Sequence, residues 1–154
     1  MPSYQSAAVA SYFTEYTPYP GYGSGKGVPD VALLGSTYTT FVGGVRKTLY
    51  GTSASAPVVA AMLTLVNDYR LNNNNSSIGW INPSLYSSHA LFVNDITSGS
   101  NFCAARDDAN TAPTCCLEGY VATSGWDPTT GFGSIKFKSF YDFYTNSNCT
   151  HSAS

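Results

Sequence analysis

Apolar and polar residues alternate along this 154-residue chain in patterns that predict helices, short strands and polar loops. Residues 3–13, SYQSAAVASYF, carry apolar side chains at helical spacing, so we expect a first helix there. The longest pattern, from about Ser53 to Arg70, is apolar on nearly all sides of its middle. That distribution is typical of a helix buried at the centre of a domain. Two further helices are expected over 82–88 and 136–144, the last one rich in aromatic residues.

Strands and loops are expected between these helices. Short β-prone runs broken by glycine predict strands at 31–36, 38–44 and 46–51. Asn82 is the expected N-cap of its helix, with Pro83 at the first helical position. Loops are expected where Pro, Gly or polar residues gather, over 17–30, over 71–79 and through most of the chain from Leu91 to the last helix. Strands followed by helices predict an α/β fold with an incomplete sheet.

Composition limits the chain to one globular domain and excludes some functions. Hydrophobic residues make up 43% of the chain and charged residues only 10%, with a net charge of -2. The 7 basic residues are spread singly, so we expect no nucleic-acid partner and no binding to anionic lipid. No apolar stretch approaches the roughly 20 residues of a membrane span.

Cysteines and glycosylation sequons both point to an oxidising compartment. Four cysteines lie in the last third of the chain: Cys103, Cys115, Cys116 and Cys149. Their spacing does not match a zinc site, and disulfides of undetermined connectivity are the better interpretation. Sequons occur at Asn74, Asn75 and Asn148, which agrees with a secretory route.

The segment LYGTSASAPVVAAMLTLVNDYR, residues 49–70, places a serine at the start of the longest helix. Unpaired N–H groups at a helix N-terminus favour an anionic transition state, and Gly51 permits close approach. Pro57 cannot donate to the carbonyl of Ser53, so we expect the first turn to open or start late and to leave Ser53 presented. The alternative is that Thr52, Ser53 and Ser55 are only capping residues.

Six sequence strings occur in order between Pro2 and about Phe143: PSYQSAAVASYF, PDVALL, GTSASAPVVAAMLTLVND, IGWINPSLY, VNDIT and GWDPTTGFGS. In this order they resemble the C-terminal part of the sedolisins, serine-carboxyl peptidases that include lysosomal and fungal tripeptidyl peptidases. The resemblance implies that residues 1–154 are the C-terminal portion of one peptidase domain, a partial subtilisin-like doubly wound sheet with no second domain. Ser53 matches the nucleophile position, whereas Tyr50 replaces a serine that usually precedes Gly51.

A serine nucleophile needs a base within hydrogen-bond reach. In sedolisins the base is a glutamate oriented by an aspartate, and a second aspartate serves the oxyanion. The resemblance places all three upstream of the matched region. Neither glutamate of this chain, Glu15 or Glu118, matches the base motif, and His89 and His151 lie in no recognisable motif. Asp30 matches a family segment, but as a residue at the entry to the sheet. We therefore expect the base to be absent from this chain.

Two loops resemble the calcium-binding elements of the same family. Carried over by position, Asp95 and Asp127 supply carboxylates, and Ile96, Thr123 and Gly125 supply backbone carbonyls, the hard oxygen ligands that calcium prefers. The family usually has glycine where Thr123 stands. A plainer interpretation is that Asp95 caps a helix or turn and that Asp127 forms an Asx turn before Pro128.

These observations lead to three hypotheses for function. The first is a sedolisin-type serine peptidase acting on peptide or protein substrates at acidic pH, secreted or lysosomal, with the missing N-terminal part of the domain as its structural partner. On this hypothesis the chain is inactive alone. The second is a non-catalytic, calcium-stabilised module that binds peptide or protein. An ordinary extracellular structural domain explains too few of the ordered matches. A partial sheet also predicts an exposed edge strand and an apolar face.

Overall fold

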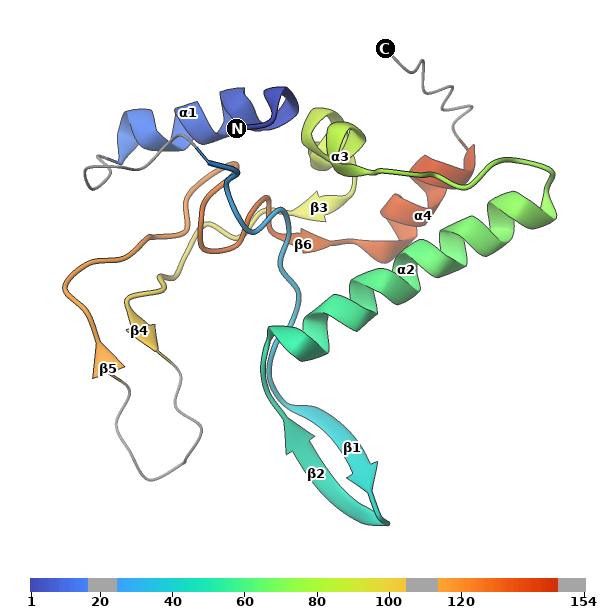
Figure 1. The fold of residues 1–154 in the computed structure, drawn as a ribbon, viewed down its shortest axis with the longest axis horizontal. Coiled ribbons are helices and arrows are strands. Elements are labelled where there is room, and N and C mark those ends of the chain that lie inside the picture. Colours follow the sequence, from blue (N-terminus) through green and yellow to red (C-terminus); the bar gives the residue numbers. More distant parts are fainter. Residues whose placement is uncertain (17–24, 105–113, 147–154) are drawn as a thin grey trace.

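A computed structural model describes residues 1–16, 25–104 and 114–146 (Figure 1). Its helices are α1 (Ser3–Glu15), α2 (Thr52–Asn72), α3 (Asn82–Ser88), a 3-10 turn η1 (His89–Leu91) and α4 (Phe137–Asn146). Its strands are β1 (Tyr38–Val42), β2 (Val45–Leu49), β3 (Val93–Asn94), β4 (Cys103–Ala104), β5 (Thr114–Cys115) and β6 (Ser134–Ile135). Among these residues, no helix is both long enough and apolar enough to cross a membrane.

The four predicted helices are all present, and they pack in two pairs. Helix α1 lies against α3, and α4 lies against α2 (Figure 1). The prediction that α2 is buried on all sides is wrong, because only Val66 and Arg70 are buried and Leu65 is 53% exposed. Asn82 is the first residue of α3 rather than its N-cap, which is Ile81.

Aromatic side chains dominate the core that these helices enclose. Phe92, Phe140 and Tyr144 are fully buried, and each of the three rings contacts the other two. Trp126 is buried below α1, where its indole N–H donates to the carbonyl of Pro29 at 3.0 Å. The high aromatic content of the sequence therefore serves packing first.

The strands form three separate two-stranded antiparallel ladders, β1–β2, β3–β6 and β4–β5. The broad α/β expectation is met, but the described residues form no doubly wound sheet. The strand predicted at 31–36 is only an extended segment with one parallel bridge, between Ala32 and Ser134. An isolated extended segment is not counted as a strand because a ladder needs a paired neighbour along its length.

The hairpin β1–β2 extends away from the helices (Figure 1). Its two-residue turn, Gly43–Gly44, has φ values of 59° and 78°, as a type I′ turn requires. The hairpin is largely exposed on both faces, and Phe41 is 68% exposed. Only Tyr50 and Gly51 separate β2 from α2, so this exposed hairpin leads directly into the turn before Ser53.

A disulfide closes the loop-rich C-terminal third. Cys103 and Cys115 face one another across the β4–β5 ladder and are bonded, which confirms the disulfide prediction. Cys116 is an exposed free thiol. Cys149, Asn148 and His151 lie outside the described residues.

Candidate active site and adjoining loops

The turn before α2 is fixed by a glycine conformation. Gly51 has φ 124° and ψ 160°, a region essentially restricted to glycine. Its amide donates to the carbonyl of Gly35 at 2.6 Å, and its own carbonyl accepts from Ala54 at 3.0 Å. The turn is therefore held between the 31–36 segment and the first residues of the helix.

Ser53 is the second residue of α2 and is exposed. Its hydroxyl makes no hydrogen bond to any residue that the structure describes. The expectation that the helix opens or starts late is wrong, because α2 runs unbroken from Thr52 through Pro57. Proline removes only the bond to the Ser53 carbonyl, which an exposed first turn can leave to water. Ser53 is nevertheless presented to solvent.

Ser55 has a different role from Ser53. Its hydroxyl donates to the carbonyls of Leu34, at 2.9 Å, and Leu33, at 3.3 Å. No side chain caps α2, because Gly51 occupies the N-cap position. The capping interpretation thus fails for the serines of this turn, and Ser55 instead ties α2 to the 31–36 segment.

A cavity of about 570 Å³ adjoins this turn. It lies between the extended segment and α2, and its lining comprises Val28, Pro29, Asp30, Val31, Ala32, Leu33, Thr52, Ser55, Ala56, Val59 and Thr129. Asp30 is the one carboxylate among these lining residues. The Thr129 hydroxyl is buried and has no hydrogen-bond partner in the part of the chain that the structure describes. The cavity is otherwise mostly apolar.

Asp30 is engaged elsewhere and is not free to act as a base. Lys26 pairs with its carboxylate at 2.8 Å, and the Tyr86 hydroxyl donates to it at 2.8 Å. Tyr86 also accepts from buried Gln5, which holds Gly27 through both its amide atoms. Burial, followed by the Asp30 contact, raises the pKa of Tyr86 well above its usual range, although the Gln5 bond opposes the shift. Asp30 thus anchors the entry to the extended segment.

The other candidate bases lie away from the cavity. Glu15 is the last residue of α1 and is exposed, and Glu118 is exposed in the loop after β5. His89 stacks on Phe132, with ring centroids 3.8 Å apart, and its Nδ1 lies 3.2 Å from the carbonyl of Tyr86. None of these three residues lines the cavity beside Ser53.

Asp127 is fully buried and organises the loop after Trp126. One carboxylate oxygen accepts the amides of Thr129, at 2.9 Å, and Thr130, at 2.7 Å, and the other accepts the amide of Thr123 at 3.0 Å. The Thr130 hydroxyl lies 3.2 Å from both oxygens. The bond from the Thr129 amide, two residues after Asp127, forms an Asx turn, so the prediction of an Asx turn at Asp127 is confirmed.

The structure also brings the other four predicted calcium ligands to this loop. The Gly125 amide donates to the Asp95 carboxylate at 2.7 Å, and the Thr130 hydroxyl lies 3.4 Å from the carbonyl of Ile96. Thr123 has no positive φ, so its side chain does not strain the backbone. Two carboxylates and the carbonyl of Ile96 thus lie on adjoining segments, and oxygen atoms of these kinds are the donors that calcium prefers. No group of three or more acidic, His or Cys side chains that could hold a metal occurs within residues 1–16, 25–104 and 114–146.

Sequence reasoning missed Thr130 and Gly133, which shape the same loops. Thr130 links Asp127 to the Ile96 carbonyl, and its place three residues after an aspartate was the available signal. Gly133 has φ 97°, and a Cβ there would lie 2.0 Å from the carbonyl oxygen of Asn94. The β3–β6 ladder therefore requires glycine at this position.

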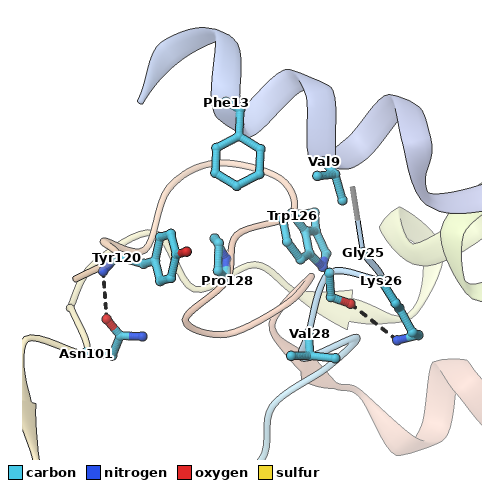
Figure 2. A pocket seen from close by; sticks show the side chains of 10 residues that line it. Val9, Phe13, Gly25, Lys26, Val28, Asn101, Tyr120, Trp126 and Pro128 are labelled. Carbon is cyan, nitrogen blue, oxygen red and sulfur yellow. Dashed lines mark hydrogen bonds between the residues drawn. The ribbon is translucent and has the colours of Figure 1, made fainter. Parts of the chain in front are cut away.

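A second cavity, of about 440 Å³, lies under α1 (Figure 2). Val9 and Phe13 of α1 lie on one side of it, and Trp126 and Pro128 lie below them. Tyr120 borders it at the far end. It shares only Val28 with the cavity beside Ser53, so the two are separate candidate binding spaces.

Comparison with known proteins agrees with these features. No protein-family profile matches the chain. The chain is 40% identical to tripeptidyl-peptidase SED1 of Arthroderma otae, over 94% of this chain and 21% of the relative. It is 41% identical to physarolisin of Physarum polycephalum, over 92% of this chain and 25% of the relative. Tripeptidyl-peptidase 1 of Rattus norvegicus is 35% identical over 88% of this chain and 24% of that protein.

This chain is homologous to a C-terminal part of the sedolisins. It spans about a fifth to a quarter of the length of these curated relatives. Two of these three relatives are named as tripeptidyl-peptidases. The homology extends over nearly all of the chain, so it includes both the turn of Ser53 and the loops of Asp95 and Asp127.

Proposed function

We propose that this chain is the nucleophile-bearing part of a sedolisin-type serine peptidase that hydrolyses peptide or protein substrates at acidic pH. One observation carries the proposal. Ser53 stands exposed at the start of α2, its hydroxyl makes no hydrogen bond to any of the described residues, and it directly follows a turn that favours glycine. A serine that served only as a helix cap would have its hydroxyl bonded to the backbone.

In this mechanism the Ser53 oxygen attacks the carbonyl carbon of the scissile peptide bond. Its proton passes to a base, and negative charge develops on the substrate oxygen. The N-terminus of α2 favours that charge through its free amides and its dipole. On this proposal the carboxylate that accepts the proton, and its partners, belong to segments outside this chain, as the resemblance to the sedolisins implies. In support, Ser53 makes no hydrogen bond to Glu15, Glu118 or His89.

The cavity beside Ser53 is the proposed place where the remainder of the domain and the substrate meet this chain. Its walls are mostly apolar, and the 31–36 segment that forms one wall has a single bridge to a neighbour among the described residues. A paired strand from the missing N-terminal part would complete this edge. The chain therefore has Ser53 in place but lacks activity until that part is present.

We also propose that calcium binds between the two loops around Asp127. Asp95 and Asp127 would hold it through carboxylates, with the carbonyls of Ile96, Thr123 and Gly125. The bound ion would offset the two negative charges and tie the loops together, so its contribution is to stability. Calcium, the Cys103–Cys115 disulfide and the sequons together support a secreted or lysosomal location.

The decisive experiment joins this chain to the preceding part of physarolisin, so that the missing carboxylates are supplied by a homologue. We expect a serine-reactive fluorophosphonate probe to label the chimera at about pH 4, where carboxylate-based chemistry operates. Ser53→Ala should abolish labelling, and Ser87→Ala, an exposed control outside the cavity, should not.

The chain alone should remain unlabelled at both pH 4 and pH 7. Ser53-dependent labelling of the chain alone would show that a base lies within these residues. A folded chimera that is never labelled would overturn the peptidase proposal and leave the non-catalytic binding module.

A further inference from the structure

The loop that follows α2 contains two overlapping glycosylation sequons, Asn74-Asn75-Ser76 and Asn75-Ser76-Ser77. The helix ends in a Schellman turn. The Asn74 amide donates to the Leu71 carbonyl at 3.2 Å, and the Asn75 amide donates to the Arg70 carbonyl at 2.9 Å. Asn74 occupies the left-handed position of this turn, with φ 58°, which asparagine tolerates. All residues from 71 to 77 are exposed.

The four asparagines at 72–75 differ in what their side-chain amides do. Asn72 donates to Asp68 at 3.2 Å, Asn73 to the Tyr69 carbonyl at 2.8 Å and Asn75 to the Asn73 carbonyl at 3.2 Å. The amide nitrogen of Asn74 has no hydrogen-bond partner within the described part of the chain. Substitution at that nitrogen therefore breaks no bond, whereas a substituted Asn75 could keep its bond to the Asn73 carbonyl only through its one remaining N–H.

We propose that Asn74 carries an N-linked oligosaccharide. In the transfer, the Asn74 Nδ2 forms a bond to the anomeric carbon of an oligosaccharide donated by a lipid diphosphate. The bond from that carbon to the diphosphate oxygen breaks, the diphosphate leaves with the electron pair, and Nδ2 loses one proton. No oxidant or reductant is involved. The proposal rests on the secretory location included in the proposed function.

The position of Asn74 keeps a glycan clear of the proposed active site. Ser53 lies at one end of α2 and Asn74 just beyond the other, as Figure 1 shows for the helix ends. At about 1.5 Å per residue the helix separates them by roughly 30 Å. A glycan at Asn74 therefore requires that this end of α2 stays in solvent, so the missing part of the domain must cover the Ser53 end instead.

The test directs the full chain, behind a signal sequence, into the secretory pathway of a yeast host. Asn148→Gln removes the third sequon in every variant. Ser76→Ala abolishes the Asn74 sequon and leaves the Asn75 sequon intact, whereas Ser77→Ala does the reverse. Both serines are exposed, and Arg70 bonds the carbonyl of Ser76 rather than its hydroxyl, so the fold is preserved.

We expect peptide N-glycosidase to lower the mass of the background protein and of the Ser77→Ala variant, but not that of the Ser76→Ala variant. Asn74→Asp, which keeps the left-handed turn, should also lack the glycan. Both medium and cell lysate are analysed, because the transfer occurs before export. A glycan retained in Ser76→Ala and lost in Ser77→Ala would overturn the assignment, and so would a background protein without any glycan. Neither result depends on peptidase activity.

Discussion

The buried carboxylate of Asp127 should be far less tolerant of amide replacement than the exposed carboxylate of Asp95. Asp127 accepts three backbone amides, from Thr123, Thr129 and Thr130. In Asp127→Asn, one oxygen becomes an NH₂ group that cannot accept. If the new NH₂ group faces Thr123, only the Thr123 amide loses its acceptor. If the side chain is turned the other way, the amides of both Thr129 and Thr130 lose theirs.

One orphaned buried amide costs about 1–3 kcal/mol, and the two remaining bonds each weaken by about 1 kcal/mol when the acceptor loses its charge. We therefore expect Asp127→Asn to lower the free energy of unfolding by about 3–5 kcal/mol. In the matched control Asp95→Asn, the amide oxygen can still accept from Gly125, so the loss should stay within about 1 kcal/mol.

Urea denaturation in the presence of a calcium chelator measures both variants against the parent chain. The chelator separates the hydrogen bonds of the carboxylates from any contribution of a bound ion. Equal losses of stability in the two variants would refute the reasoning, because they would mean that burial and the number of amide donors do not decide the role of Asp127.

Four further outcomes are expected. Calcium at about 100 times its dissociation constant should raise the free energy of unfolding by about 2.7 kcal/mol, measured by urea denaturation, and this gain should shrink in both carboxylate variants. Ser55→Ala should cost about 1 kcal/mol through its lost hydrogen bonds. Ser53→Ala should cost almost nothing in the same assay, because the Ser53 hydroxyl is exposed and has no hydrogen bond within the described part of the chain. Gly133→Ala should lower the melting temperature much more than Gly79→Ala does. Gly79 has φ 64° and open space around it, so alanine there adds only about 1 kcal/mol of backbone strain. The raised pKa of Tyr86 means that the folded state favours its neutral form, so the free energy of unfolding should fall as the pH rises above 10.0, the ordinary pKa of tyrosine. Denaturation curves across this pH range should show a smaller fall for Tyr86→Phe.

Local patterns were sufficient to predict the helices but not all of their surroundings. Residues 3–13 lie on α1 and residues 137–144 lie on α4, as the spacing of their apolar side chains predicts; only Lys136 of the predicted residues falls outside. Asn82 was misplaced by one position, since a cap depends on backbone angles that a sequence does not display. Pro57 did not open the helix, because an exposed first turn tolerates one missing bond.

The candidate site was predictable to a similar extent. Ser53, Asp95 and Asp127 were predicted from the six ordered strings that resemble the sedolisins. The structure brings Asp95 and Asp127 onto adjoining loops. The Asx turn of Asp127 follows from sequence alone. The anchoring role of Ser55 does not, because its acceptors are the carbonyls of residues 33 and 34, which are distant in sequence.

The two largest discrepancies have a common physical account under the proposed function. Helix α2 has the composition of a helix surrounded by protein, yet only Val66 and Arg70 of its residues are buried. The 31–36 segment has the composition of a strand, yet it has one bridge. Both border the cavity beside Ser53. Sequences are shaped by the complete domain, and this chain spans 21–25% of the length of two of its relatives. We therefore expect that one and the same part of the complete domain packs against α2 and against the 31–36 segment. That part would also supply the base for Ser53.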